Sequence, residues 1–79
     1  MNINVPRPPS TLPTVGYLVK VMPLDELGMV YTRAVRNRRN ARRLIGRWIR
    51  RRGVLAGAAF PIVTDGHGYR PAREEDYRR

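Results

Sequence analysis

The sequence predicts a small α+β domain in which a short N-terminal strand is followed by two helices and then by a β-hairpin. Three observations predict this: a β-branched segment at residues 14–22, apolar residues at helical spacing in 24–35 and 38–52, and an Asp-Gly turn within 60–71. Folded domains need about 50–200 residues. The 79 residues therefore form one domain at most, with a thin core.

The first 13 residues are expected to form an extended or flexible Pro-rich arm. Four prolines lie between Pro6 and Pro13, and proline fixes φ and lacks an amide donor. Residues 14–22 follow, rich in β-branched and aromatic side chains that favour a strand. Alternation along this strand predicts one apolar face, made of Val15, Tyr17, Val19 and Val21.

Residues 24–35 are predicted to form the first helix. Pro23 suits a helix start, and carboxylates at Asp25 and Glu26 would offset the positive end of the helix dipole. The apolar positions at three-and-four spacing are Leu24, Leu27, Gly28, Tyr31, Ala34 and Val35. The pattern breaks near Asn37, where we place a turn; one bent helix is the alternative.

Residues 38–52 are predicted to form the second helix, with an apolar stripe that packs in the core. The stripe consists of Ala41, Leu44, Ile45, Trp48 and Ile49. At about 100° per residue, the opposite side of the helix carries arginines. These are Arg39, Arg42, Arg43, Arg47 and Arg50. Gly53 is placed to end the helix, and the cations at 50–52 suit its negative end.

Residues 60–71 are predicted to form a β-hairpin around Asp65-Gly66-His67, because glycine tolerates the positive φ of a tight turn. Pro61 and Pro71 should confine those strand ends to sheet edges. No conformation is assigned to Leu55–Phe60. The domain is expected to span 14–72, followed by a charged tail at 73–79 that is too short for a stable helix alone.

The charge distribution points to a polyanionic partner. Lys and Arg number 16 against 6 Asp and Glu, and the net charge is +10. No acidic residue occurs from Leu27 to Thr64, whereas ten arginines crowd between Arg33 and Arg52. A polyanion would relieve their mutual repulsion, and DNA carries one charge per about 1.7 Å of axis. A GC-rich genome would explain arginine over lysine, but not the absence of acids.

The composition argues against catalysis, metal binding and membrane insertion. There is no cysteine and one histidine, so no thiol nucleophile and no zinc site of cysteines are available. The pair Asp65 and His67 lies in a Gly-rich turn without a supporting constellation. No apolar run reaches the roughly 18 residues of a membrane span, and no signal peptide opens the sequence. We therefore expect a non-enzymatic cytoplasmic protein, nucleoid-associated or in a host cytoplasm, without cofactor or metal.

The segment RRLIGRWIRRRG…PIVTDGHGYRPA, Arg42–Ala72, resembles the recognition-helix-to-wing half of small winged-helix DNA-binding proteins of phage and bacterial-regulator type. The resemblance implies a winged-helix-like fold and regulatory binding to double-stranded DNA. Two features depart from that pattern. Leu55–Phe60 lengthens the path from helix to strand, and residues 1–22 contain no counterpart of the family's first helix.

If the resemblance holds, the second helix enters the major groove N-terminal end first, because a helix about 10–12 Å across fits a groove about 12 Å wide. The base contacts would come from Arg39, Asn40 and Arg43. The phosphate contacts would come from Arg36, Arg38, Arg42, Arg47 and Arg50. The wing would contribute Gly66, His67 and Arg70. A specific site would also need a homodimer on two half-sites, for which the sequence shows no surface.

Two other partners stay open, and a membrane surface is not expected. The arginine-rich helix also resembles helices that bind structured RNA, with Trp48 stacking on a base; its place on the apolar stripe favours DNA. A small basic protein of this kind could also occupy an acidic groove on a host enzyme. Binding to a membrane surface would require a free apolar stripe, which a folded core denies.

Overall fold

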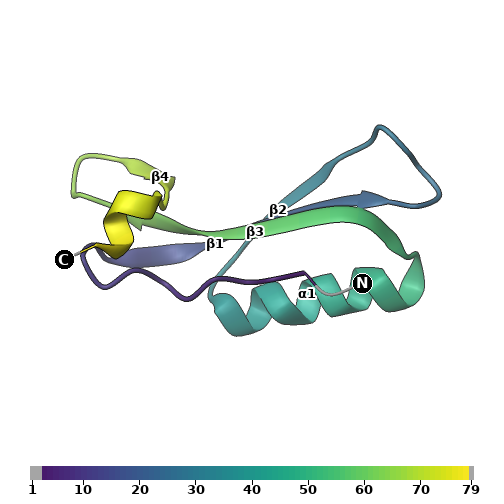
Figure 1. Ribbon diagram of the computed structural model, residues 1–79, viewed down its shortest axis with the longest axis horizontal. Helices are drawn as coiled ribbons and strands as arrows, with labels where there is room; N and C mark the ends of the chain where they lie inside the picture. Colours follow the sequence, from purple (N-terminus) through teal and green to yellow (C-terminus); the bar gives the residue numbers. More distant parts are fainter. Residues whose placement is uncertain (1–2, 79) are drawn as a thin grey trace.

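Four antiparallel strands form one sheet in the order β2-β1-β3-β4, in a computed structural model that describes residues 3–78. The strands are β1 (Thr14–Pro23), β2 (Tyr31–Val35), β3 (Val54–Thr64) and β4 (Tyr69–Pro71). Helix α1 (Arg38–Arg51) runs along one side of the sheet, and a 3-10 turn, η1 (Glu74–Tyr77), lies near β4 (Figure 1). The molecule is elongated, with extents of 40 × 20 × 19 Å.

The expected first helix is wrong, and with it the winged-helix-like arrangement of two helices and a wing. Residues 24–30 form turns, and Tyr31–Val35 forms β2, which pairs in register with Tyr17–Val21 of β1. Pro23 ends β1 instead of starting a helix, and Gly28 has a φ of +93°, outside the helical region. The spacing of the apolar residues in this short segment is compatible with both a helix and a strand. Backbone hydrogen bonding with β1 stabilises the strand.

The second predicted helix is confirmed, and its apolar stripe packs on β1. Tyr17, Val19 and Val21 point to the helix and are 1–2% exposed. Ala41, Leu44 and Ile45 are buried against this cluster, while Trp48 and Ile49 are partly buried at its border.

Both ends of α1 have local causes. The Asn37 side chain accepts a hydrogen bond from the Asn40 amide at 2.9 Å, which caps the N-terminus where the pattern breaks. Gly53, at φ +74°, follows the C-terminus and leads directly into β3.

Strand β1 is confirmed, but Val15 does not belong to its buried face. A register shift between Thr14 and Gly16 breaks the alternation, and Val15 is 48% exposed. Gly16 lies where β2 leaves the sheet towards α1. A Cβ at Gly16 would meet the Val35 carbonyl oxygen at 2.7 Å. Glycine therefore permits the close approach of the two backbones.

The predicted hairpin is also confirmed, and Leu55–Phe60, left unassigned, lies within β3. Gly66 supplies the positive φ of the turn, +94°. Pro61 is not at an edge, because β3 lies between β1 and β4. Its carbonyl accepts from the Ala72 amide at 2.8 Å, just beyond the end of β4. Its nitrogen therefore points away from β1, and the missing donor removes no bond of the β1–β3 ladder.

The Pro-rich segment is extended and packs beside α1. Val5 is 4% exposed and belongs to the core. The Tyr17 hydroxyl donates to the Pro6 carbonyl at 2.6 Å, and Arg38 Nε donates to the Val5 carbonyl at 2.8 Å. Burial raises the pKa of Tyr17. Hydrogen bonds from both β1 and α1 thus hold residues 3–13 in place.

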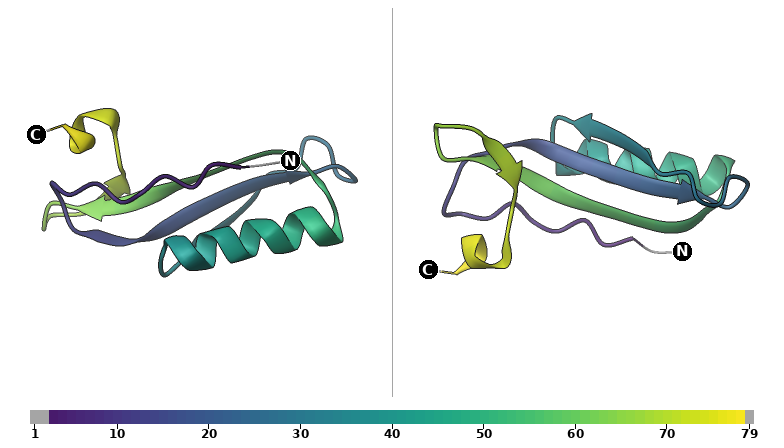
Figure 2. Two further views of the ribbon diagram at one scale, coloured as in Figure 1. Left: turned by 60° about the horizontal axis from the view of Figure 1, so that its bottom comes forward. Right: turned by 90° about the horizontal axis from the view of Figure 1, so that it is seen from above.

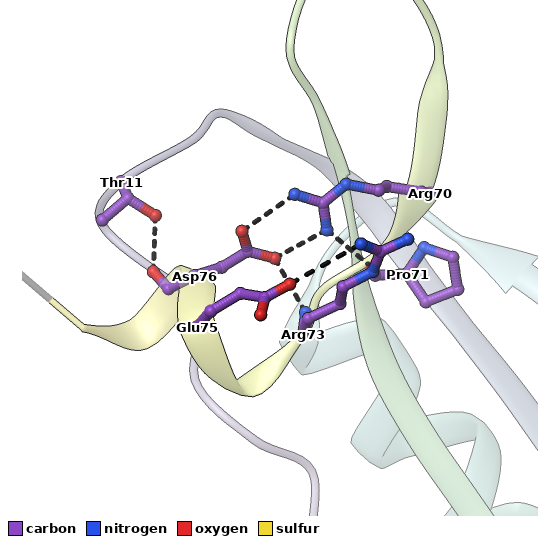
Figure 3. Close-up of polar contacts among 6 residues, drawn as sticks. All are labelled: Thr11, Arg70, Pro71, Arg73, Glu75 and Asp76. Carbon is purple, nitrogen blue, oxygen red and sulfur yellow. Dashed lines mark hydrogen bonds and ion pairs between the residues drawn. The ribbon is translucent and has the colours of Figure 1, made fainter.

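The C-terminal tail holds the hairpin through a buried carboxylate (Figure 3). Asp76, 7% exposed, accepts two hydrogen bonds from Arg70 at 2.7 and 2.9 Å and one from the Arg73 amide at 2.7 Å. The Arg70 guanidinium, and then the Arg73 amide, lower the pKa of Asp76 to about 2. The Thr11 hydroxyl donates to the Asp76 carbonyl. The described part of the tail, residues 73–78, contains one 3-10 turn that tertiary contacts stabilise.

Candidate nucleic-acid interface

A groove of about 450 Å³ runs between α1 and β2. Its wall on α1 is built by Asn40, Arg43, Leu44 and Arg47, whose i, i+3, i+4, i+7 spacing places them on one stripe. Its other wall is the end of β2 and the residues that follow, Arg33 to Arg36. Arg33 faces the helix because it pairs with Val19, whose side chain is buried beneath α1.

A second hollow, of about 530 Å³, lies on the outer side of α1 among Arg38, Arg39, Arg42 and Arg43. Arg43 lines both hollows, so the two surfaces are continuous. We call this surface the basic face. It consists of Arg33, Arg36, Arg38, Arg39, Asn40, Arg42, Arg43 and Arg47.

The arginines of the basic face carry unneutralised charge. Within residues 3–78, the ion pairs engage Arg52, Arg70, Arg73 and Arg78, and none of them lies on this face. The first turn of α1 contains no acidic residue, so the positive end of the helix dipole adds to the side-chain charge. The basic face is therefore a concave, cationic surface suited to phosphate or carboxylate groups.

Most of the predicted contact residues lie on this face. Arg36, Asn40, Arg43 and Arg47 come together in the groove, and Arg38, Arg39 and Arg42 lie on the outer side. The structure separates them by location, groove against outer side, which differs from the expected division into base and phosphate contacts.

Two arginines of the predicted set stand apart from the others. Arg38 is only partly available to a ligand, because its Nε donates a hydrogen bond to the Val5 carbonyl oxygen. Arg50 lines neither hollow; its guanidinium approaches Gly46 and would lie 3.1 Å from a Cβ there.

The predicted wing lies elsewhere. Figure 1 shows β4 and the hairpin tip at one end of the sheet, beyond the N-terminal end of α1. Gly66 and His67 are exposed at this tip, where the Asp65 carboxylate accepts from the His67 amide at 2.8 Å. Arg70 is bound by Asp76 (Figure 3), and that hydrogen bond raises the pKa of Arg70. We therefore leave the hairpin out of the basic face.

Sequence reasoning missed Arg33 as a site residue. A helical interpretation of 24–35 gave this arginine no relation to the second helix. The alternation of Tyr31, Arg33 and Val35 was the available indication, because a strand turns alternate residues to one face.

The C-terminal end of the groove is apolar and aromatic. A hollow of about 240 Å³ borders Arg33 and Leu44 and continues towards Trp48; its other lining residues are Val19, Val21, Tyr31 and Thr32. The rings of Tyr31 and Trp48 lie 5.2 Å apart. The Arg52 guanidinium lies over both, 5.6 and 5.1 Å from their centroids.

A pair of carboxylates holds this aromatic end. Arg52 pairs with Asp25 at 2.8 Å, and the hydrogen bond raises the pKa of the guanidinium. The Tyr31 hydroxyl donates to Glu26 at 2.6 Å, which raises the pKa of Tyr31. Trp48 is therefore engaged within the protein, at the border of the core and not at its centre.

Within residues 3–78 no group of three or more His, Cys, Asp or Glu side chains is arranged to hold a metal ion. In the same part of the chain, no helix has the length and apolar character needed to cross a bilayer. No protein-family model matches the sequence, and comparisons with curated proteins and with solved structures also found no match.

Proposed function

We propose that the protein binds double-stranded DNA, without catalysis, through the basic face. One observation carries this proposal: arginines on two facing walls, with Asn40 on the α1 wall, form a groove whose cations have no carboxylate partner among residues 3–78. Arginine and asparagine are the residue types that read guanine and adenine edges and hold phosphates.

Duplex DNA fits this surface better than structured RNA. Arg39, Arg42 and Arg43 are exposed on α1, and a helix of this diameter fits the major groove. Sequence-specific RNA recognition targets unpaired bases in loops and bulges, which stack on aromatic side chains. Trp48 already packs against both Tyr31 and Arg52, which argues against such stacking.

The position of each residue on the basic face indicates whether it would contact bases or phosphates. Asn40 and Arg43, at the centre of the face, are placed to approach base edges, with Arg39 beside them on the outer side. The flanking cations, Arg33 and Arg47 among them, would hold phosphates, which position the protein without reading sequence.

Fluorescence anisotropy tests the proposal with random duplex DNA, an RNA hairpin and single-stranded DNA across a salt series. Neutralisation of about six phosphates predicts a slope of log K against log salt of about −5 for duplex DNA. Duplex DNA should bind more tightly than the RNA hairpin at each salt concentration. Tighter binding of the RNA, or a slope near zero, would exclude this mechanism.

An acidic protein segment is the second candidate, and the apolar hollow beside Leu44 and Trp48 favours it. A segment with carboxylates followed by one apolar side chain would match the groove from its cationic to its apolar end. Such a peptide should change Trp48 fluorescence and displace duplex DNA. DNA binding that an acidic peptide cannot displace would rule this candidate out.

A further inference from the structure

The sheet has a second face that α1 does not cover. Because Tyr17, Val19 and Val21 point to α1, the alternate residues of β1 and their register partners point to the other side. We call this side the open face. It consists of Leu18, Lys20, Met22, Thr32, Ala34, Ala56, Ala58 and Phe60.

Neither the helix nor the N-terminal segment reaches the open face. Val5 and Ile3 pack in the core together with α1, on the covered side. Viewed from above in Figure 2, α1 lies behind β1 and β2, and no segment crosses the middle portions of β1 and β3. Within residues 3–78, all eight residues of the open face are partly or fully exposed.

The chemistry of the open face differs from that of the rest of the surface. Lys20 is its one charged residue, in a chain that is 28% charged. The face is flat because it carries three alanines, Ala34, Ala56 and Ala58. It is apolar because it also carries Leu18, Met22 and Phe60. Monomeric proteins rarely expose a continuous apolar patch of this kind, which usually marks an interaction site.

We propose that two copies of this chain pack through their open faces to form a symmetric dimer. The charge distribution favours a second copy: the basic face lies on the α1 side, so that this packing keeps the two sets of arginines apart. Contact through α1 would instead bring the two +10 chains together at their most cationic surfaces. The dimer would be a layered sandwich, with the two sheets about 10 Å apart.

The size of the open face suits a dimer. Three strands about 4.8 Å apart, of which β2 is five residues long, cover roughly 240 Å² in projection, and the accessible surface of their side chains is larger. The loop between β1 and β2 rises on the same side in Figure 1 and exposes Leu27, Met29 and Val30 by 67, 53 and 52%. Because a standard interface takes roughly 800 Å² from each partner, the proposed interface includes both the open face and this loop.

Lys20 opposes this packing. Its ammonium group lies 5.8 Å from the centre of the Phe60 ring, a contact that leaves the charge in solvent in the monomer. In the dimer its stem must lie along the sheet and carry the charge to the rim. Removal of the charge should therefore strengthen the dimer.

Sedimentation equilibrium of the nuclease-treated full chain tests the proposal, at concentrations up to about 100 µM, where an interface of standard size should be populated. The wild type should show twice the chain mass of 9.1 kDa. Ala34→Glu/Ala58→Glu should sediment as a monomer with unchanged circular dichroism, because both alanines are exposed and a glutamate at 58 lies opposite Lys20.

Two further variants sharpen the result. His67→Glu adds a carboxylate at the exposed hairpin tip and should remain a dimer, whereas Lys20→Met should lower the dissociation constant about tenfold. A monomeric wild type, a dimeric Ala34→Glu/Ala58→Glu or a weakened Lys20→Met dimer would each overturn the proposal. If the protein also binds DNA as proposed, the dimer carries two basic faces on opposite outer surfaces and bridges two duplexes. The sedimentation result does not depend on DNA binding.

Discussion

The salt dependence of DNA binding should fall when one arginine is neutralised on each wall of the groove. Arg33 comes from β2 and Arg43 from α1, so Arg33→Gln/Arg43→Gln removes two charges from the basic face and keeps most of the stem of each side chain. Neither guanidinium takes part in an ion pair among residues 3–78. Both side chains are exposed, and the fold should therefore tolerate the change.

The magnitude follows from the number of phosphate contacts. Each contact adds about 0.9 to the slope of log K against log salt, so about six contacts give a slope of about −5.4 and the double variant about −3.6. Between 50 and 200 mM salt, the wild type should then lose about 1,800-fold in affinity and the variant about 150-fold.

Fluorescence anisotropy with one labelled duplex measures both slopes. Arg7→Gln/Arg78→Gln is the matched control, because it removes the same charge from two exposed positions outside the basic face. The control should lower affinity slightly and leave the slope near that of the wild type. If the groove variant keeps the wild-type slope, or if the control lowers the slope as much, the groove is not the phosphate-binding surface.

Gly16→Ala should destabilise the protein by about 1–3 kcal/mol in urea unfolding, because the new Cβ meets a backbone oxygen; Gly68→Ala, which meets nothing within 4 Å, is the control. Asn37→Ala should lower the free energy of unfolding by about 1 kcal/mol through loss of the helix cap. An unchanged stability would contradict the cap. Because the pKa of Asp76 is lowered to about 2, its contribution to stability is present above its usual pKa of 3.8 and is lost as the pH falls towards 2. Thermal melts at several pH values should show this loss, and Asp76→Asn, destabilised at neutral pH, should lack that component.

Those parts of the fold governed by local pattern could be predicted from the sequence. The stripe from Ala41 to Ile49, the β-branched residues of β1 and the Asp65-Gly66 turn each determine their element locally, and all three are present in the structure. Residues 24–35 could not be predicted in this way. Their apolar spacing fits a short helix as well as a turn and strand, and pairing with β1 is a tertiary interaction.

The candidate site, too, could be predicted only where local sequence pattern determines it. The arginines of α1 are evident from helical periodicity, but Arg33 joins them only because β2 lies beside the helix. In the tail, sequence reasoning missed a residue with a structural role. Asp76 looks like one of several solvated acids, yet Arg70, six residues before it, binds it where the tail turns back on β4, and Asp76 is buried there.

Backbone amide shifts during titration with duplex DNA test the central claim most directly. The claim predicts that the largest changes fall at Arg33, Asn40 and Arg43, with little change at Gly66–Gly68. Saturable binding whose changes concentrate at the hairpin tip, or titration that leaves the groove amides unmoved, would contradict the assignment of the basic face as the DNA-binding surface.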